Sequence, residues 1–173
     1  MNFDADVFDE KGSVNKNKRN RLIIVIGLLI LIAAVGAVFI FVLGITKVQG
    51  ISMEPNFHDK QTVLYLRHSS LERGDVVGIK MTNGDAYIKR IIGLPGDEID
   101  IKDGKVYLNG ELLQEDYIQG STYLPADNKI SYPFTVEEGT YFVMGDNREH
   151  SDDSRTFGPV AKRQIEGEII TNP

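Results

Sequence analysis

A long run without a charged residue, from Leu22 to Ile45, constrains this chain more than any other feature. At about 1.5 Å per residue a helix over this run spans roughly 36 Å, enough for a bilayer core of about 30 Å. Buried core helices rarely stay free of polar residues for so long, and the apolar part of a cleaved signal peptide is normally about 7–15 residues. We therefore predict a single transmembrane helix at 22–45, with a cleaved signal peptide as the alternative.

The residues that flank this run predict its orientation. Residues 1–21 are polar and are expected to form a mobile cytoplasmic tail. Only Lys47 and Lys60 follow closely after the run. The basic residues just before it are Lys16, Lys18, Arg19 and Arg21. The positive-inside rule predicts a single-pass protein of the cell membrane, with the N-terminus in the cytoplasm and an extracytoplasmic domain at 46–173.

Composition excludes several kinds of chemistry and partner. The chain has 173 residues and a formal net charge of -6, which argues against a general nucleic-acid binder. It has no cysteine, so a disulfide, a thiolate nucleophile and a cysteine metal site are excluded. Its histidines show no metal-ligand spacing. We expect no metal and no cofactor.

The part of the chain after the apolar run has the pattern of a β domain. Asn83-Gly84, Asp103-Gly104 and Glu138-Gly139 each separate two short apolar runs, which is typical of hairpin turns. The fold class is predicted as mainly β, a twisted antiparallel or barrel-like domain, with the last strand closing the sheet. The predicted strands are Thr62–Leu66, Asp75–Met81, Ala86–Ile92, Glu98–Ile101, Val106–Leu108, Tyr132–Val136, Thr140–Met144 and Gln164–Ile170.

Ser52 is the candidate nucleophile. It lies in a loop-like segment shortly after the predicted membrane helix, between Gly50, which permits close backbone approach, and Pro55, which fixes the chain beyond. Most serines are merely solvated, but this setting favours a reactive one. Because a serine hydroxyl is a poor nucleophile, it needs a base.

The histidines are weak candidates for that base. A Ser-His-Asp triad keeps no fixed order along the chain, so any of them could in principle serve. Yet His58, His68 and His150 all lie in polar, loop-like segments without a supporting motif. We interpret all three as solvated surface residues.

Lys89 is the stronger candidate. Strand alternation places it on one face with Tyr87 and Ile91. A two-residue turn at 83–84 would set Lys89 opposite Gly78, leaving room beside the amine. The alternative is a solvated lysine on an edge strand. A free lysine titrates near pH ~10.4, so a base requires burial that lowers its pKa to roughly 6–8.

The segment 145–158 is dense in polar residues. Charged runs are usually solvated, but Gly145 and Gly158 bracket this one, and its hydroxyls can bond the backbone or a buried amine. Its acids and arginines are expected to form an internal ion-pair network: Asp146, Arg148, Asp153 and Arg155. Such a loop would lock the base lysine in place.

With these segments in view, the chain resembles the bacterial type I signal peptidases, the membrane-bound Ser/Lys endopeptidases that remove signal peptides from exported proteins. Four blocks carry the resemblance in the family's order. They are Ser52-Met53-x-Pro55, Arg73-Gly74-Asp75-Val76-Val77, Tyr87-x-Lys89-Arg90-x-x-Gly93-x-Pro95-Gly96-Asp97 and Gly145-Asp146-Asn147-Arg148-x-x-Ser151-x-Asp153-Ser154-Arg155-x-Phe157-Gly158. The single anchor and compact domain look Gram-positive.

The resemblance implies roles for these residues. Ser52 would attack the scissile carbonyl and form an acyl-enzyme, and Lys89, beside Tyr87, would be its base. Ser151 would hydrogen-bond the Lys89 amine. Asp153 and Arg155 would hold the loop, Asp146 and Arg148 would be more structural, and Met53 would pack beside the nucleophile. The fold would be that shared with the self-cleaving repressor proteases.

The resemblance also implies the partners. Signal peptides of exported preproteins would bind as an added strand and be cut after small-x-small (A-x-A) sites. The protein would sit in the lipid bilayer and act as a monomer.

The sequence departs from the family pattern at two places. Gly50 stands where some relatives carry a serine that helps to hold the oxyanion, so backbone N–H groups, that of Ser52 first, would hold it here. Asn56-Phe57 replaces a common Thr-Leu and is expected to alter packing only.

Two alternatives remain at this stage. One is a signal-peptidase-like assembly factor for surface or pilus proteins. The other is a self-cleaving repressor on the same fold, which the membrane helix disfavours.

Overall fold

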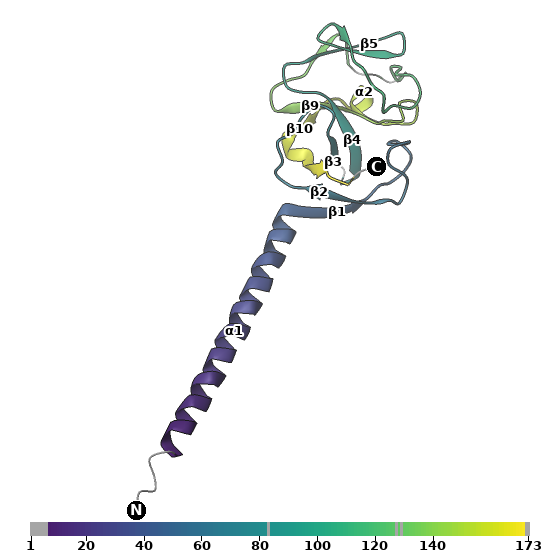
Figure 1. Ribbon diagram of the computed structural model, residues 1–173. Coiled ribbons are helices and arrows are strands. Elements are labelled where there is room, and N and C mark those ends of the chain that lie inside the picture. The colour runs from purple at the N-terminus through teal and green to yellow at the C-terminus, as the bar shows by residue number, and fades with distance from the viewer. Residues whose placement is uncertain (1–6, 83, 127, 129, 172–173) are drawn as a thin grey trace, which may run out of the picture. The chain divides into compact units, whose positions relative to one another are not determined.

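The computed structural model describes residues 7–82, 84–126, 128 and 130–171, and for 7–15 it describes the backbone alone. The chain forms two compact units, Met1–Phe41 and Val42–Pro173. Helix α1, Val7–Val42, makes up the described part of the first unit and ends one residue beyond it, and Figure 1 shows it as one continuous helix. Its apolar side chains from Leu22 onwards are exposed, and Lys16–Val42 is long and apolar enough to cross a membrane. The apolar helix therefore fits a membrane span.

The predicted limits of this helix need correction. Residues 7–21, predicted to be a mobile tail, are helical, while residues 1–6 lie outside the described residues. At the other end the helix stops at Val42, and Leu43–Lys47 forms strand β1. The reason for this end lies in tertiary pairing: Leu43 pairs with Leu66 of the next strand, and Gly44 packs so closely on the ring of Tyr65 that a Cβ there would clash.

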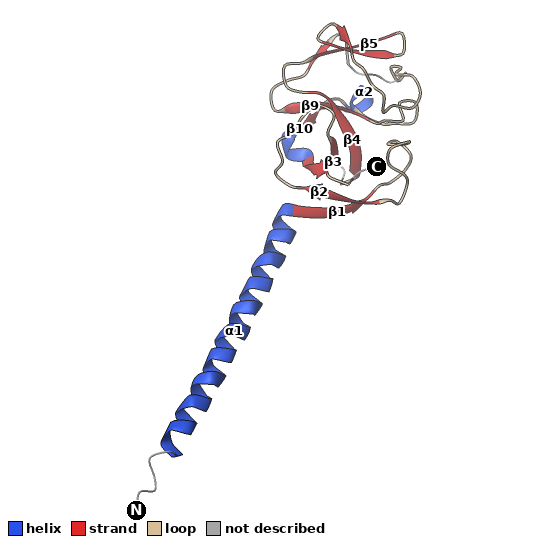
Figure 2. Cartoon of the chain, in the orientation of Figure 1, coloured by secondary structure: helices blue, strands red, loops and turns tan. Residues whose placement is uncertain are grey.

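The second unit contains a large antiparallel sheet. Within the described residues it has seven strands in the order β1-β2-β11-β3-β4-β9-β10 (Figure 2). Since β1 and β10 are the two edges of the sheet within the described residues, the sheet is open. The predicted antiparallel β fold is confirmed, whereas a barrel-like closure is not formed. Apart from β1, its strands are β2 Thr62–Leu66, β3 Val76–Lys80, β4 Ala86–Gly93, β9 Thr140–Met144, β10 Val160–Ala161 and β11 Ile165–Ile169.

The last strand has a different place from the one expected. It was predicted to close the sheet, and instead β11 lies inside it, paired with both β2 and β3. The 3₁₀ turn η1, Lys162–Gln164, leads into it and is the short blue helix beside β10 in Figure 2.

A smaller sheet carries the second predicted hairpin. Its order is β7-β6-β5-β8, and its strands are β5 Glu98–Lys102, β6 Lys105–Leu108, β7 Glu111–Leu112 and β8 Phe134–Thr135. Lys102 pairs with Lys105, so Asp103-Gly104 is a two-residue turn, and both residues have the positive φ that such a turn requires.

The third predicted hairpin is wrong. β8 pairs with β5 of the small sheet, whereas β9 pairs with β4 and β10 of the large one. The turn at Glu138-Gly139 therefore passes the chain from one sheet to the other. A turn motif specifies a local reversal, but it does not specify which strands pair on either side of it.

Buried apolar side chains form three clusters. One lies under the segment that carries Ser52, and includes Met53, Phe57 and Ile88. A second lies between the small sheet and the start of β9, centred on Ile92, Ile99 and Phe142. The third packs Val77, Ile91 and Val143 on the other side of β3, β4 and β9. Strand β4 contributes to all three, so its position is firmly fixed.

Candidate active site

Ser52 and Lys89 meet in the structure. The Lys89 amine donates a hydrogen bond to the Ser52 hydroxyl, with Nζ and Oγ 2.7 Å apart. Lys89 is only 3% exposed and Ser52 is half-buried. The two residues that the sequence singled out, 37 positions apart, thus lie within proton-transfer distance.

Burial sets the protonation of Lys89. Desolvation lowers the pKa of its amine to about 8, because removal from water disfavours the charged form; Asp153 and Asp152 oppose this lowering and Arg155 adds to it. At pH 7 a pKa of about 8 leaves roughly one amine in ten neutral, against about one in a few thousand for an unperturbed lysine. The amine is therefore available as a proton acceptor near neutral pH.

The predicted neighbour of Lys89 was wrong by one residue. Lys89 pairs with Val77, and Gly78 lies opposite Ile88. The connection after β3 is longer than two residues, since Met81 N–H bonds to Asp85 O. Gly84 has the positive φ expected of the turn, and Asn83 lies outside the described residues. Burial among packed strands, and not a gap at Gly78, is what desolvates the amine.

The segment with Ser52 is held from the C-terminal loop. Asn147 donates its backbone N–H to Ser52 O at 3.0 Å and its side-chain amide to Ile51 O at 3.2 Å. The backbone of Gly145 lies very close to Ser52. A Cβ on Gly145 would be 2.5 Å from Ser52 O and would clash with the Ser151 hydroxyl. Only glycine fits there.

Ser151 does not make the predicted hydrogen bond. Its Oγ is buried against Gly145 and has no hydrogen-bond partner within the described chain, so the expected bond to the Lys89 amine is not formed. The motif predicted that Ser151 lies near the lysine, but a motif does not determine the direction in which a hydroxyl points.

Asp153 and Arg155 make most of the hydrogen bonds within the loop. Asp153 caps the short helix α2, Ser154–Phe157, and its carboxylate accepts bonds from the Arg155 side chain and from Gly145 N–H. These contacts hold the pKa of Asp153 below its ordinary value, although burial opposes them. Arg155 in turn donates to Arg148 O and Tyr123 O.

The other two charges of the loop pair outside it, which corrects the predicted internal network. The carboxylate of Asp146 binds Arg90 of β4 and the side-chain amide of Asn56. The guanidinium of Arg148 is completely buried and pairs with Glu115, while also donating to Thr122 and Gly145 O. The loop is thereby tied to three distant segments.

Tyr87, Met53 and Gly50 occupy supporting positions. The Tyr87 ring centroid lies 5.4 Å from Lys89 Nζ, and the ring also contacts Phe157. Met53 is 1% exposed, anchoring the segment in the core. Gly50 has φ +78 and its N–H bonds Asp59.

His58, His68 and His150 are exposed, as predicted.

Sequence reasoning missed Asn147 and the role of Asn56. Asn56 was expected to affect packing alone, yet its amide also bonds Tyr117 O at 2.8 Å. The only signal for Asn147 was its place between Asp146 and Arg148. Among the described residues no group of His, Asp and Glu is arranged to hold a metal ion.

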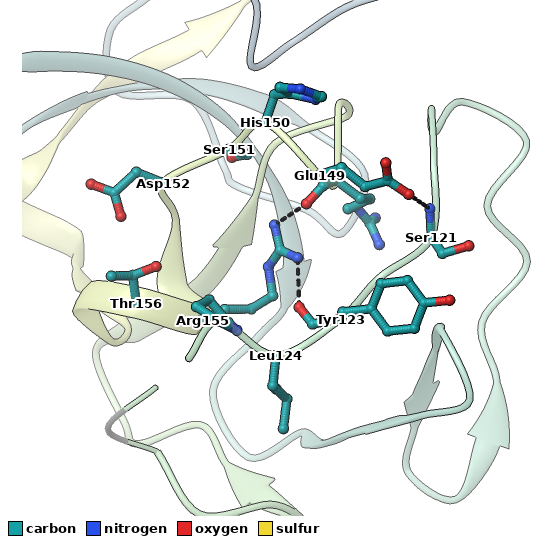
Figure 3. Close-up of a pocket in the computed structure, with 11 residues that line it drawn as sticks. Ser121, Tyr123, Leu124, Glu149, His150, Ser151, Asp152, Arg155 and Thr156 are labelled. Carbon is teal, nitrogen blue, oxygen red and sulfur yellow. Dashed lines mark hydrogen bonds between the residues drawn. The ribbon is translucent and has the colours of Figure 1, made fainter. Parts of the chain in front are cut away.

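A pocket of about 650 Å³ lies between the C-terminal loop and residues 121–125 (Figure 3). Arg155 crosses it and donates to Tyr123 O, while Glu149 accepts from Ser121 N–H. Its lining includes Ser121, Tyr123, Leu124, Pro125, Glu149, His150, Ser151, Asp152 and Thr156.

Comparison with known proteins identifies the family. Residues 19–171 match the family described as signal peptidase, peptidase S26. The chain belongs to this family of hydrolases. It is 39% identical to signal peptidase I of Bacillus amyloliquefaciens, covering 80% of each chain. It is 35% identical to signal peptidase I V of Bacillus subtilis, covering 71% of this chain and 81% of that one.

A solved structure is also similar. It is a signal peptidase I from Enterococcus faecalis, 34% identical, with a TM-score of 0.47, covering 60% of this chain and 98% of that chain.

Proposed function

We propose that this protein is a membrane-bound serine endopeptidase that removes signal peptides from exported preproteins after small-x-small sites, with Ser52 as nucleophile and Lys89 as general base. The observation that carries the proposal is the 2.7 Å hydrogen bond from Lys89 Nζ to Ser52 Oγ. The lowered pKa of the buried amine supports the second role.

The reaction proceeds in two steps. Neutral Lys89 accepts the proton of the Ser52 hydroxyl while Oγ attacks the scissile carbonyl, and the resulting ammonium returns the proton to the departing amine. The signal peptide then remains as an ester on Ser52. In the second step Lys89 takes a proton from water, the hydroxide attacks the ester, and the proton returns to Ser52.

The oxyanion is held by the backbone in this proposal. Gly50 offers no hydroxyl, and the N–H of Ser52 makes no hydrogen bond within the described chain. That N–H is available to bind the negative oxygen of the tetrahedral intermediate.

The preprotein binds as an added strand beside β4. Strand β9 pairs with β4 only from Arg90 onwards, so at 86–89 the edge of β4 that faces away from β3 has no strand partner among the described residues. An extended peptide on this edge would place its carbonyl groups next to Lys89 and Ser52. All the proposed catalytic groups come from one chain, so the protein acts as a monomer.

The orientation follows from charge. Basic residues at positions 16–21 precede the apolar part of α1 and favour a cytoplasmic N-terminus, with the catalytic domain on the far side. The alternative of an assembly factor without protease activity is not favoured, because both reactive residues are present and the relatives are signal peptidases.

The test is cleavage of a preprotein with an A-x-A site by purified full-length protein in detergent or lipid. Ser52→Ala abolishes cleavage, and a metal chelator leaves the wild-type rate unchanged. Cleavage by the Ser52→Ala variant at a near wild-type rate, or its loss with chelator, contradicts the proposal.

A further inference from the structure

A second pocket, of about 260 Å³, lies away from the Ser52–Lys89 pair, between the turn after β2 and the η1–β11 segment. None of its lining residues belongs to the candidate active site. They are His68, Ser69, Leu71, Lys162, Arg163, Ile165, Glu166 and Gly167.

A buried polar atom at this pocket lacks a hydrogen-bond partner. The Ser69 hydroxyl, which lines it, is buried and makes no hydrogen bond within the described chain. Nε of Arg67, two residues earlier and outside the pocket lining, also has no hydrogen-bond partner within the described chain. Buried donors without an acceptor are rare in folded proteins. The Ser69 hydroxyl can therefore donate to an oxygen-rich ligand in the pocket.

The charged groups at the pocket favour an anion. Lys162 and Arg163 are exposed and form no ion pair with any described carboxylate. Glu166 is the one carboxylate among the lining residues, and its Oε2 lies 3.9 Å from where a Cβ on Gly78 would stand, toward β3. The pocket is therefore lined by two basic side chains, the polar side chains of His68 and Ser69, and one acid.

A backbone hydrogen bond ties the chain just before the pocket residues to the end of the apolar helix. Arg67 N–H donates to the carbonyl of Val42, the last residue of α1, at 2.8 Å. His68 and Ser69 follow directly. If α1 spans a bilayer, these residues stand at the level of the phospholipid headgroups, where phosphate is concentrated.

We propose that this pocket binds the phosphate of an anionic phospholipid headgroup. The phosphate oxygens accept hydrogen bonds from Ser69 and His68 and pair with Lys162 and Arg163. Free phosphate shares this chemistry, but the pocket's closeness to the end of α1 favours the lipid. The proposal requires α1 to lie in a membrane and is independent of the chemistry at Ser52.

The experiment uses full-length protein in a neutral maltoside detergent. It is titrated separately with short-chain phosphatidylglycerol, short-chain phosphatidylcholine and inorganic phosphate, and hydrogen exchange is followed in residues 66–71 and 160–167. Phosphatidylglycerol gives saturable protection of both segments, whereas phosphatidylcholine gives none. The Lys162→Gln/Arg163→Gln variant binds phosphatidylglycerol about tenfold or more weakly.

The matched control is Lys80→Gln/Lys105→Gln, which removes two exposed lysines elsewhere and leaves the affinity unchanged. Ser69→Ala supplies a second variant and also weakens binding. Cleavage of a short soluble peptide stays at the wild-type rate in every variant, which separates this proposal from the proposed activity. Absence of protection, equal protection by phosphatidylcholine, protection by inorganic phosphate alone, or equal weakening in the control overturns the proposal.

Discussion

The guanidinium of Arg90 binds both carboxylate oxygens of Asp146, at 2.8 and 2.7 Å, while the preceding residue on the same strand, Lys89, bonds Ser52. Because successive strand residues point to opposite faces, β4 is anchored on one face and presents the amine on the other. Asp146 also accepts from Asn56, in the segment that carries Ser52. One carboxylate thus joins the strand of the base to the segment of the nucleophile.

Removal of this carboxylate is expected to destabilise the domain strongly. Asp146→Ala leaves the mostly buried guanidinium of Arg90 without a counter-ion, which costs about 3–5 kcal/mol in the free energy of unfolding. Urea unfolding measures this loss in the free energy of unfolding. The control is Lys60→Gln, which breaks an exposed ion pair with Asp59 and leaves the midpoint nearly unchanged. Similar midpoints for the two variants would contradict the anchoring role.

Gly145→Ala is expected to be severe, although it adds a single methyl group. The new Cβ would clash with Ser52 O and the Ser151 hydroxyl, so the segments that carry them must move apart. We predict a loss of at least about 100-fold in kcat/KM. Gly78→Ala is the matched control, because a Cβ there meets only ordinary contacts at 3.9 Å and no positive φ. Equal activity of both variants would show that the close packing at Gly145 is unimportant.

The pH dependence of cleavage is expected to report Lys89. Its amine accepts a proton only when neutral, and burial lowers its pKa to about 8. The value of kcat/KM therefore falls about tenfold per pH unit below 8 and levels off above it. A pH–rate profile on a short peptide measures this. A plateau that extends below pH 6 would be incompatible with Lys89 as the base.

Burial of the Lys89 amine is also expected to destabilise the folded protein. Its folded-state pKa lies below the unfolded value of 10.5, so folding must expel a proton or bury a charge at neutral pH. The penalty is full below pH 8 and disappears as pH rises from about 8 to about 10.5. Lys89→Met is predicted to raise the free energy of unfolding by about 1–3 kcal/mol at pH 7. Unfolding at pH 7 and pH 10 checks this, and the gain must be smaller at pH 10.

Local sequence patterns predicted much of the secondary structure. β2, β3, β4 and the β5–β6 hairpin fall where alternation and turn residues placed them. The errors came from pairing between distant segments. Apolar composition could not show that Leu43–Ile45 leaves the helix to pair with β2, nor could Glu138-Gly139 reveal that β8 and β9 belong to different sheets.

For the candidate site too, the sequence predicted local features and missed contacts between distant residues. Motifs selected Ser52, Lys89, Asp153 and Arg155, and the structure brings them together. Motifs could not give the direction of the Ser151 hydroxyl. The partners of Asp146 and Arg148 were also missed, because Arg90 and Glu115 lie 56 and 33 positions away in sequence. The catalytic roles of Ser52 and Lys89 stay predictions.

The most direct test of the central claim is the rate at which full-length Lys89→Ala cleaves an A-x-A preprotein at pH 8, beside the wild-type protein and Lys89→Arg. Loss of the base is predicted to lower kcat by about 10²–10⁴-fold. Lys89→Arg fails as well, because a guanidinium keeps its proton in this pH range. Circular dichroism confirms that both variants are folded. A folded Lys89→Ala protein with near wild-type kcat would contradict the Ser52–Lys89 mechanism.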